Sequence, residues 1–121
     1  MKQLLLVFLG GGVGSALRYL IGKQLNTNSF PYGTFIVNIV GCLIIGFLLT
    51  YISKNNNLNQ NQTLLLATGF CGGFTTFSTF AYENVFFLKQ GEPLNFFLYT
   101  ILSFSIGIIG IYIGIWLGKM V

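Results

Sequence analysis

The sequence predicts an all-α integral membrane protein with four membrane-spanning helices per subunit, and three observations support that fold class. Hydrophobic residues make up 54% of the 121 residues and charged residues only 7%, whereas a soluble domain carries roughly a quarter charged residues. The mean hydropathy is +0.77. Four apolar segments are each long enough to supply the ~20 residues that a helix needs to cross the hydrocarbon core of a bilayer.

The four expected spans are separated by short polar segments. The spans cover residues 3–22, 33–52, 63–88 and 94–117. The segments between them are rich in Asn, Ser, Gly and Pro, which is typical of turns. A chain of this length suits a single domain, so we expect one four-helix membrane domain over residues 1–121.

The first span begins like a secretory signal. Residues 1–16 contain one Lys, a short apolar core and then small residues, which is the pattern of a cleaved leader. The apolar run nevertheless continues to Ile21, and this makes it about long enough to cross the membrane. We therefore expect this segment to remain as the first membrane helix.

Small residues recur every four positions in the first and fourth spans. They are Gly10 and Gly14, and Gly110, Gly114 and Gly118. Glycines at this spacing let helix backbones approach one another closely. We expect these residues to lie at helix–helix contacts.

The third span is too long for a straight helix and carries an unusual stretch. Its 26 residues would measure about 39 Å, against a hydrocarbon core of about 30 Å. Residues 69–80, GFCGGFTTFSTF, contain a glycine pair and clustered threonines, which weaken helices. Unwound backbone at membrane depth is tolerated only where it is buried in protein or lines a polar cavity. We predict a break near the middle of this span, where freed carbonyls and threonine hydroxyls would suit an alkali cation.

The loop lysines do not decide which way the protein inserts. Four spans place Lys2, Lys54 and Lys119 at one end, and Lys23 and Lys89 at the other. The positive-inside rule therefore hardly favours either orientation. Two interpretations stay open. One is dual topology, with two copies in an antiparallel homodimer, and the other is a fixed orientation set by other features.

Charge and composition also exclude several functions. The six basic residues are scattered singly and form no basic stripe for nucleic acid, so the lipid headgroups are their expected partner. The chain has no His and only two acidic residues, and most acid–base or metal catalysis therefore lacks the residues it needs. We expect no enzyme and no nucleic-acid partner.

Two polar side chains inside the first two spans are functional candidates. Arg18 is the only charged residue well inside the first span. It would line an anion-attracting vestibule or extend to the headgroups. Asn38 lies in the middle of the second span, one turn after Thr34. Its amide would offer donors to an anion or bridge to another helix.

Phe77 and Phe80 follow the expected break and fall on one helical face. Phenylalanine ring edges carry partial positive charge and can face an anion, although an aromatic pair at this spacing also suits simple packing. Thr76, Ser78 and Thr79 supply hydroxyls around the rings. These features alone predict a pore or a transporter without naming its substrate.

Three motifs together resemble the CrcB/Fluc family of fluoride channels. They are GGGVGSALRY at 10–19, GTFIVNIVG at 33–41 and GFCGGFTTFSTFAYE at 69–83, and the resemblance covers essentially the whole chain. It implies a passive fluoride channel of the bacterial cell membrane, built as an antiparallel dual-topology homodimer with two pores. A heteromer with a related chain is also possible in this family.

The resemblance also implies roles for individual residues. A structural sodium ion at the dimer axis would be bound by the backbone carbonyls of Gly72 and Thr75. Arg18 would line the vestibule, and Glu83 would lie near the pore end. The residues implied along the fluoride pathway are Asn38, Phe77, Phe80, Thr34, Ser78, Thr79, Tyr99 and Ser103. The fourth helix matches less clearly, because it has no distinctive motif. Gly107 also stands where some members carry another hydroxyl.

Two other classes of protein fit parts of the sequence. A small proton-coupled multidrug transporter can also have four spans, but coupling needs an intramembrane carboxylate, and Glu83 is the only candidate. A scaffold that assembles other membrane proteins would not require a broken helix with a phenylalanine pair.

Overall fold

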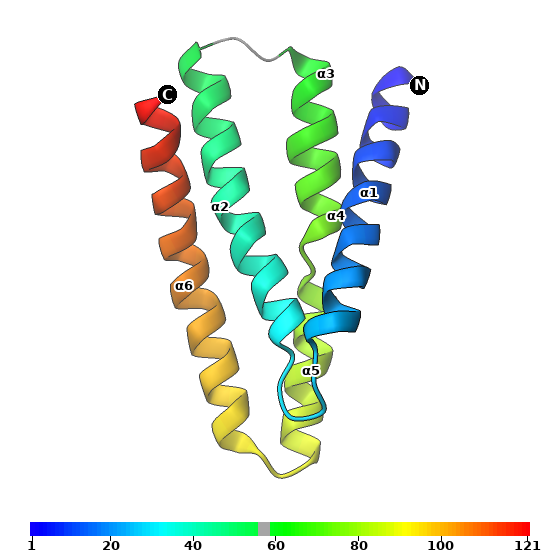
Figure 1. Ribbon diagram of the computed structural model, residues 1–121, viewed down its shortest axis with the longest axis vertical. Coiled ribbons are helices and arrows are strands. Elements are labelled where there is room, and N and C mark those ends of the chain that lie inside the picture. The colour runs from blue at the N-terminus through cyan, green and yellow to red at the C-terminus, as the bar shows by residue number, and fades with distance from the viewer. Residues whose placement is uncertain (56–58) are drawn as a thin grey trace.

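The computed structural model describes residues 1–55 and 59–121; the predicted polar turn between the second and third spans includes residues 56–58, which lie outside this range. Four long helical segments run alternately up and down, with both termini at the same end (Figure 1). The elements are α1 (Lys2–Leu25), α2 (Tyr32–Asn55), α3 (Gln60–Thr63), the π-helix η1 (Leu64–Cys71), α4 (Gly72–Phe74), α5 (Phe77–Lys89) and α6 (Pro93–Met120).

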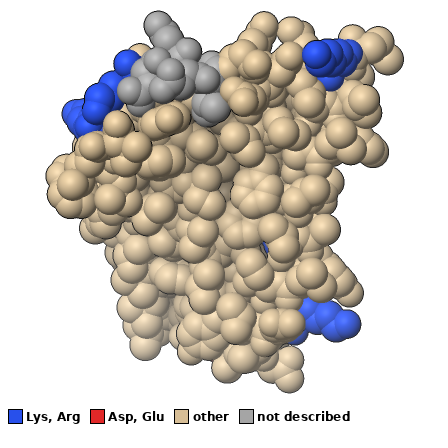
Figure 2. Space-filling model, turned by 45° about the horizontal axis from the view of Figure 1, so that its top comes forward, with Lys and Arg blue, Asp and Glu red and all other residues tan. Residues whose placement is uncertain are grey.

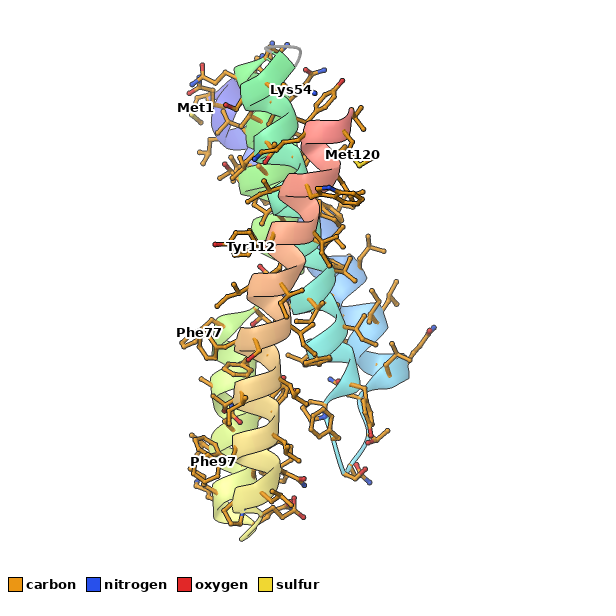
Figure 3. The ribbon with its side chains drawn as sticks, turned by 90° about the vertical axis from the view of Figure 1, so that its left-hand side faces the viewer. Met1, Lys54, Phe77, Phe97, Tyr112 and Met120 are labelled. Carbon is orange, nitrogen blue, oxygen red and sulfur yellow. The ribbon has the colours of Figure 1, made fainter. Side chains whose placement is uncertain are left out.

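The prediction of four membrane-spanning segments is confirmed. The helical segments long and apolar enough to cross a membrane are Lys2–Leu25, Tyr32–Lys54, Gln60–Lys89 and Pro93–Met120. Basic side chains lie toward the ends of the face shown in Figure 2, with a broad uncharged surface between them. Met1, Lys54 and Met120 lie at one end and Phe97 at the other (Figure 3). Lys2 and Lys119 are the sequence neighbours of Met1 and Met120, so they lie at the same end as Lys54, as expected.

The predicted break in the third span is confirmed, and it falls on two threonines. Thr75 (φ −92°, ψ 159°) and Thr76 (φ −150°, ψ 123°) are extended, whereas Gly72 is still helical. The Thr79 N–H donates to Thr76 Oγ1 at 3.2 Å, so Thr76 caps the new helix. The part of the span before the break widens into a π-helix, a form that often marks functional sites.

The spaced glycines lie at helix contacts within the chain. α1 packs on η1 and α4, and α2 packs on α6. A Cβ added to Gly14 would overlap the Phe70 carbonyl oxygen, and one added to Gly114 would overlap the Leu43 carbonyl oxygen. Only glycine therefore permits either approach, as the spacing predicts.

A small aromatic core connects α5 to α6 below the break. Phe80, Phe87 and Tyr99 are buried together. The Tyr99 ring centroid lies 4.9 Å from that of Phe80 and 6.0 Å from that of Phe87. Because this core includes Phe80, it fixes one of the two phenylalanines that follow the break.

Candidate functional site

A cavity of about 560 Å³ lies beside the break, between α2, the third span and α6. It brings together six of the residues that the sequence predicts for the site, which are Asn38, Gly72, Thr75, Phe77, Phe80 and Ser103. Much of the remaining lining is aliphatic, including Ile45, Ile108 and Ile111. The cavity is thus mostly apolar, with a few polar residues in its wall.

Asn38 holds the break open through the backbone of Thr76. The Thr76 N–H donates to Asn38 Oδ1 at 2.8 Å, and Asn38 Nδ2 donates to the Thr76 carbonyl at 3.1 Å. In a continuous α-helix the same N–H would donate to the carbonyl of Gly72. Because a primary amide carries two N–H protons, Asn38 can bind Thr76 and still offer a donor to the cavity. The structure therefore shows the cross-helix bridge, and it also leaves room for the anion-donor interpretation.

The break removes the helical donors from the carbonyls of Gly72 and Thr75. The Thr76 N–H goes to Asn38, and the Thr79 N–H goes to Thr76 Oγ1. Carbonyl oxygens freed in this way suit an alkali cation, so both residues fit the role predicted for them. The described residues form no group of three or more His, Cys, Asp and Glu side chains that could bind a metal.

Arg18 reaches the break from α1. Its Nε donates to the Gly73 carbonyl at 3.0 Å, and Ser15 Oγ lies 3.4 Å from the same oxygen. In a continuous helix this carbonyl would accept from the Phe77 N–H. Arg18 therefore satisfies a carbonyl that the break has stranded, a role that the sequence reasoning missed. The sequence feature that could have indicated this role is spacing. Ser15 and Arg18 lie one turn beyond Gly11 and Gly14, on the face of α1 that packs against the third span.

The two phenylalanines after the break differ in exposure. Phe77 is 73% exposed and Phe80 only 7%, and their ring centroids lie 6.0 Å apart. Figure 3 shows Phe77 projecting outward at the start of α5. Phe80 is held by Tyr99 and by an edge-on contact with Phe104. One ring is thus fixed in the chain, whereas the other contacts Phe80 but leaves most of its apolar surface exposed in this single chain.

Three other predicted residues form a separate hydrogen-bonded cluster. Thr34 Oγ1 donates to Glu83 Oε2, and Tyr99 OH donates to Glu83 Oε1, each at 2.8 Å. Thr34 is 4% exposed and Tyr99 is fully buried. Glu83 lies one turn after Phe80, and none of the three lines the 560 Å³ cavity. The hydroxyls predicted for the fluoride pathway here donate to a carboxylate of the protein.

The other predicted hydroxyls are divided between exterior and interior. Ser78 and Thr79 are exposed on α5 and do not line the cavity. Ser103 lines the cavity, and its Oγ is buried without a hydrogen-bond partner among the described residues. The structure adds two buried polar side chains that the sequence reasoning missed, Asn84 and Thr100, which likewise have an unpartnered oxygen within the described part of the chain. The only sequence feature that could have indicated Asn84 and Thr100 is that each is a polar residue within an apolar segment.

Together these features define a small multi-pass membrane protein whose third span is interrupted beside a cavity with few polar groups. The family model described as CrcB-like protein, Camphor Resistance (CrcB), matches residues 5–115. The chain therefore belongs to this family, and the predicted resemblance is confirmed.

Named relatives resemble the chain over nearly its whole length. It is 49% identical to the fluoride-specific ion channel FluC of Phocaeicola vulgatus, over 98% of this chain and 100% of the relative. It is 54% identical to the protein of the same name from Gloeothece citriformis, over 98% of each chain. For the Oceanobacillus iheyensis protein of that name, the identity is 43% over 95% of this chain and 90% of the relative. These relatives are ion channels, which confirms the prediction that the chain is not an enzyme.

Proposed function

We propose that the chain conducts fluoride passively across the cell membrane of a bacterium, allowing the ion to leave the cell down its gradient. The observation that carries the proposal is the cavity at the break, where the Asn38 amide and the rings of Phe77 and Phe80 meet. The names of the relatives support fluoride as the ion. A broken helix that presents donors and ring edges to one cavity suits an anion pathway.

The chemistry of fluoride fits these groups. Fluoride is small and strongly hydrated, so leaving water requires well-placed donors. The second N–H of Asn38 can donate in the cavity. Ser103 also lines the cavity, and its hydroxyl has no partner among the described residues. Between donors, the positive ring edges of the phenylalanines favour an anion without adding a charge.

We further propose that two copies assemble as an antiparallel dual-topology homodimer with two pores. The nearly balanced distribution of lysines between the two ends supports insertion in both directions, and the exposed ring of Phe77 supplies an apolar face for a second copy. A sodium ion at the dimer axis would be held by the carbonyls of Gly72 and Thr75, and it would supply a fixed positive charge that links the two breaks. A heteromer with a related chain is the alternative outcome.

Efflux from liposomes that contain only the purified chain tests this function. Fluoride should leave rapidly when a fluoride electrode records the release, while chloride in a parallel sample should remain inside. Fast fluoride release without chloride release would establish both selectivity and a competent homomer. Absence of fluoride release from folded, inserted protein would contradict the homomeric channel and direct the search to a second chain.

Conduction should be passive, so we predict that an imposed pH gradient leaves the initial rate of fluoride efflux unchanged at a fixed membrane potential. The opposing proposal, a proton-coupled transporter, would use Glu83, the carboxylate inside the third span. The measurement compares efflux with and without the pH gradient when potassium and valinomycin clamp the potential. A rate that rises with an inward proton gradient in the wild type, but not in Glu83→Gln, would favour the transporter.

Replacing Phe80 by Ile should slow fluoride efflux by about tenfold or more, which corresponds to ~1.4 kcal/mol in the barrier. Isoleucine fills most of the space but has no aromatic edge. Phe97→Ile is the matched control, because Phe97 is 56% exposed on α6 and does not line the cavity. Equal rates in the two variants would show that the ring of Phe80 only packs.

A further inference from the structure

We infer that Asn26 is a positioning residue for the Thr34–Glu83–Tyr99 cluster. The inference rests on the proposed fluoride conduction for its consequence, but its geometry stands alone. Asn26 ends α1, where its N–H donates to the Gly22 carbonyl at 2.9 Å. The sequence pattern marks it only as a loop residue.

The side chain of Asn26 has a fixed orientation. Its Oδ1 accepts the backbone N–H groups of Gly33 at 2.7 Å and Thr34 at 3.1 Å, both in the first turn of α2. A flipped amide would direct its own N–H groups at these two donors. The observed orientation is therefore the only one that satisfies them, and Nδ2 is left beside Thr34 Oγ1, at 3.4 Å.

This orientation determines the direction of the next hydrogen bond. An amide N–H can only donate, so Thr34 Oγ1 accepts from Asn26 and has its single proton left for another group. That proton goes to Glu83 Oε2, while Tyr99 donates to Oε1. Asn26 thereby directs the Thr34 hydroxyl toward α5, and Glu83 receives one donor on each oxygen.

Glu83, the centre of the cluster, lines a second cavity of the protein. Phe80 lines the 560 Å³ cavity at the break, and Glu83, one turn later on α5, lines a second cavity of about 620 Å³. Asn26 and the rest of the loop to Pro31 form one wall of the second cavity. Asn26 and the carboxylate whose donor it positions therefore line the same cavity.

An isosteric substitution separates this role from helix capping. Asn26→Asp keeps the acceptor for Gly33 and Thr34, and Asp caps helices as well as Asn does, so the unfolding temperature should hold. The substitution replaces the donor with a second acceptor, which competes with Glu83 for the Thr34 proton. Because a hydrogen bond to a charged group is lost, fluoride efflux should fall about tenfold. Asn59→Asp makes the same change at another exposed helix cap, which lines neither cavity, and should change efflux by less than about twofold.

A double substitution tests whether Asn26 acts through Thr34. If it does, Asn26→Asp should add no further loss of efflux to Thr34→Val, because residues in one network are not additive. The carboxylate stretch of ¹³C-labelled Glu gives a readout independent of flux, since the chain has only two acidic residues. The Glu83 band should shift in Asn26→Asp and not in Asn59→Asp.

The outcomes distinguish this inference from the proposed function. The positioning role would be overturned if the wild type conducts fluoride and Asn26→Asp does not differ from Asn59→Asp. Additive losses in the double variant would overturn it as well. A wild type without fluoride efflux would overturn the proposed function. In that case, the shifted Glu83 band would still support Asn26 as the residue that positions the carboxylate, and an unchanged band would overturn it.

Discussion

Replacement of Asn38 by Leu is expected to abolish fluoride efflux, with a fall of about 100-fold or more. The variant removes both hydrogen bonds to Thr76 and leaves the Thr76 N–H without the acceptor that holds the break. An unsatisfied buried donor costs ~1–3 kcal/mol, so the unfolding temperature should fall as well. The Thr76 N–H could then donate to the Gly72 carbonyl and close the break, or the break could widen. In either case the variant lacks the Asn38 amide that donates in the cavity.

Asn38→Asp separates anchoring from donation. It keeps an acceptor for the Thr76 N–H but has no N–H to offer, and it adds a negative charge to the cavity. We expect its unfolding temperature to lie closer to that of the wild type than that of Asn38→Leu, while efflux of fluoride stays low in both. The measurements are liposome efflux and thermal unfolding in detergent. Wild-type efflux in Asn38→Leu would show that Asn38 serves neither purpose.

The four spans could be predicted because the bilayer sets their length. Apolar runs of about 20 residues report membrane helices without knowledge of any neighbour, and all four were confirmed. The spacing of Gly10 and Gly14 likewise predicts a close helix contact. What the spacing cannot say is which helix fills the contact, and the structure places η1 and α4 of the same chain there.

The exact point of the break could not be predicted from composition. The glycine pair suggests a break at Gly72 and Gly73, yet both are helical and the chain extends at Thr75 and Thr76. The position is decided by Asn38 on another helix, which takes the N–H that would have continued the helix. Local propensity is a weak prior that tertiary contacts override.

The candidate site was predictable in its residues but not in its partners. Periodicity places Thr34 on the same face as Asn38, but Thr34 binds Glu83, 49 residues away in the chain. Arg18 binds a carbonyl 55 residues away. Such pairs depend on how the helices are arranged, and no local pattern reports them. The roles of Ser78 and Thr79, exposed in the single chain, remain predictions that depend on the assembled channel.

The largest effect on stability is expected from a single methyl group, in Gly14→Ala. The new Cβ would overlap the Phe70 carbonyl oxygen and lie 2.8 Å from the Phe74 nitrogen, so α1 would have to move away from the third span. Overpacking of this kind costs ~1–3 kcal/mol, and it would also withdraw Arg18 from the Gly73 carbonyl. We therefore expect a lower unfolding temperature and reduced fluoride efflux in the same variant.

Gly12→Ala is the matched control, because it makes the same change two residues earlier in the same helix. A Cβ on Gly12 meets nothing within 4 Å, and alanine favours a helix over glycine by ~0.8–1.0 kcal/mol. Its unfolding temperature should therefore equal or exceed that of the wild type, while that of Gly14→Ala falls. Equal stability in the two variants would show that α1 can move off the third span at little cost. In that case Arg18 would not be held at the break by packing, and its bond to Gly73 would have to persist without that support.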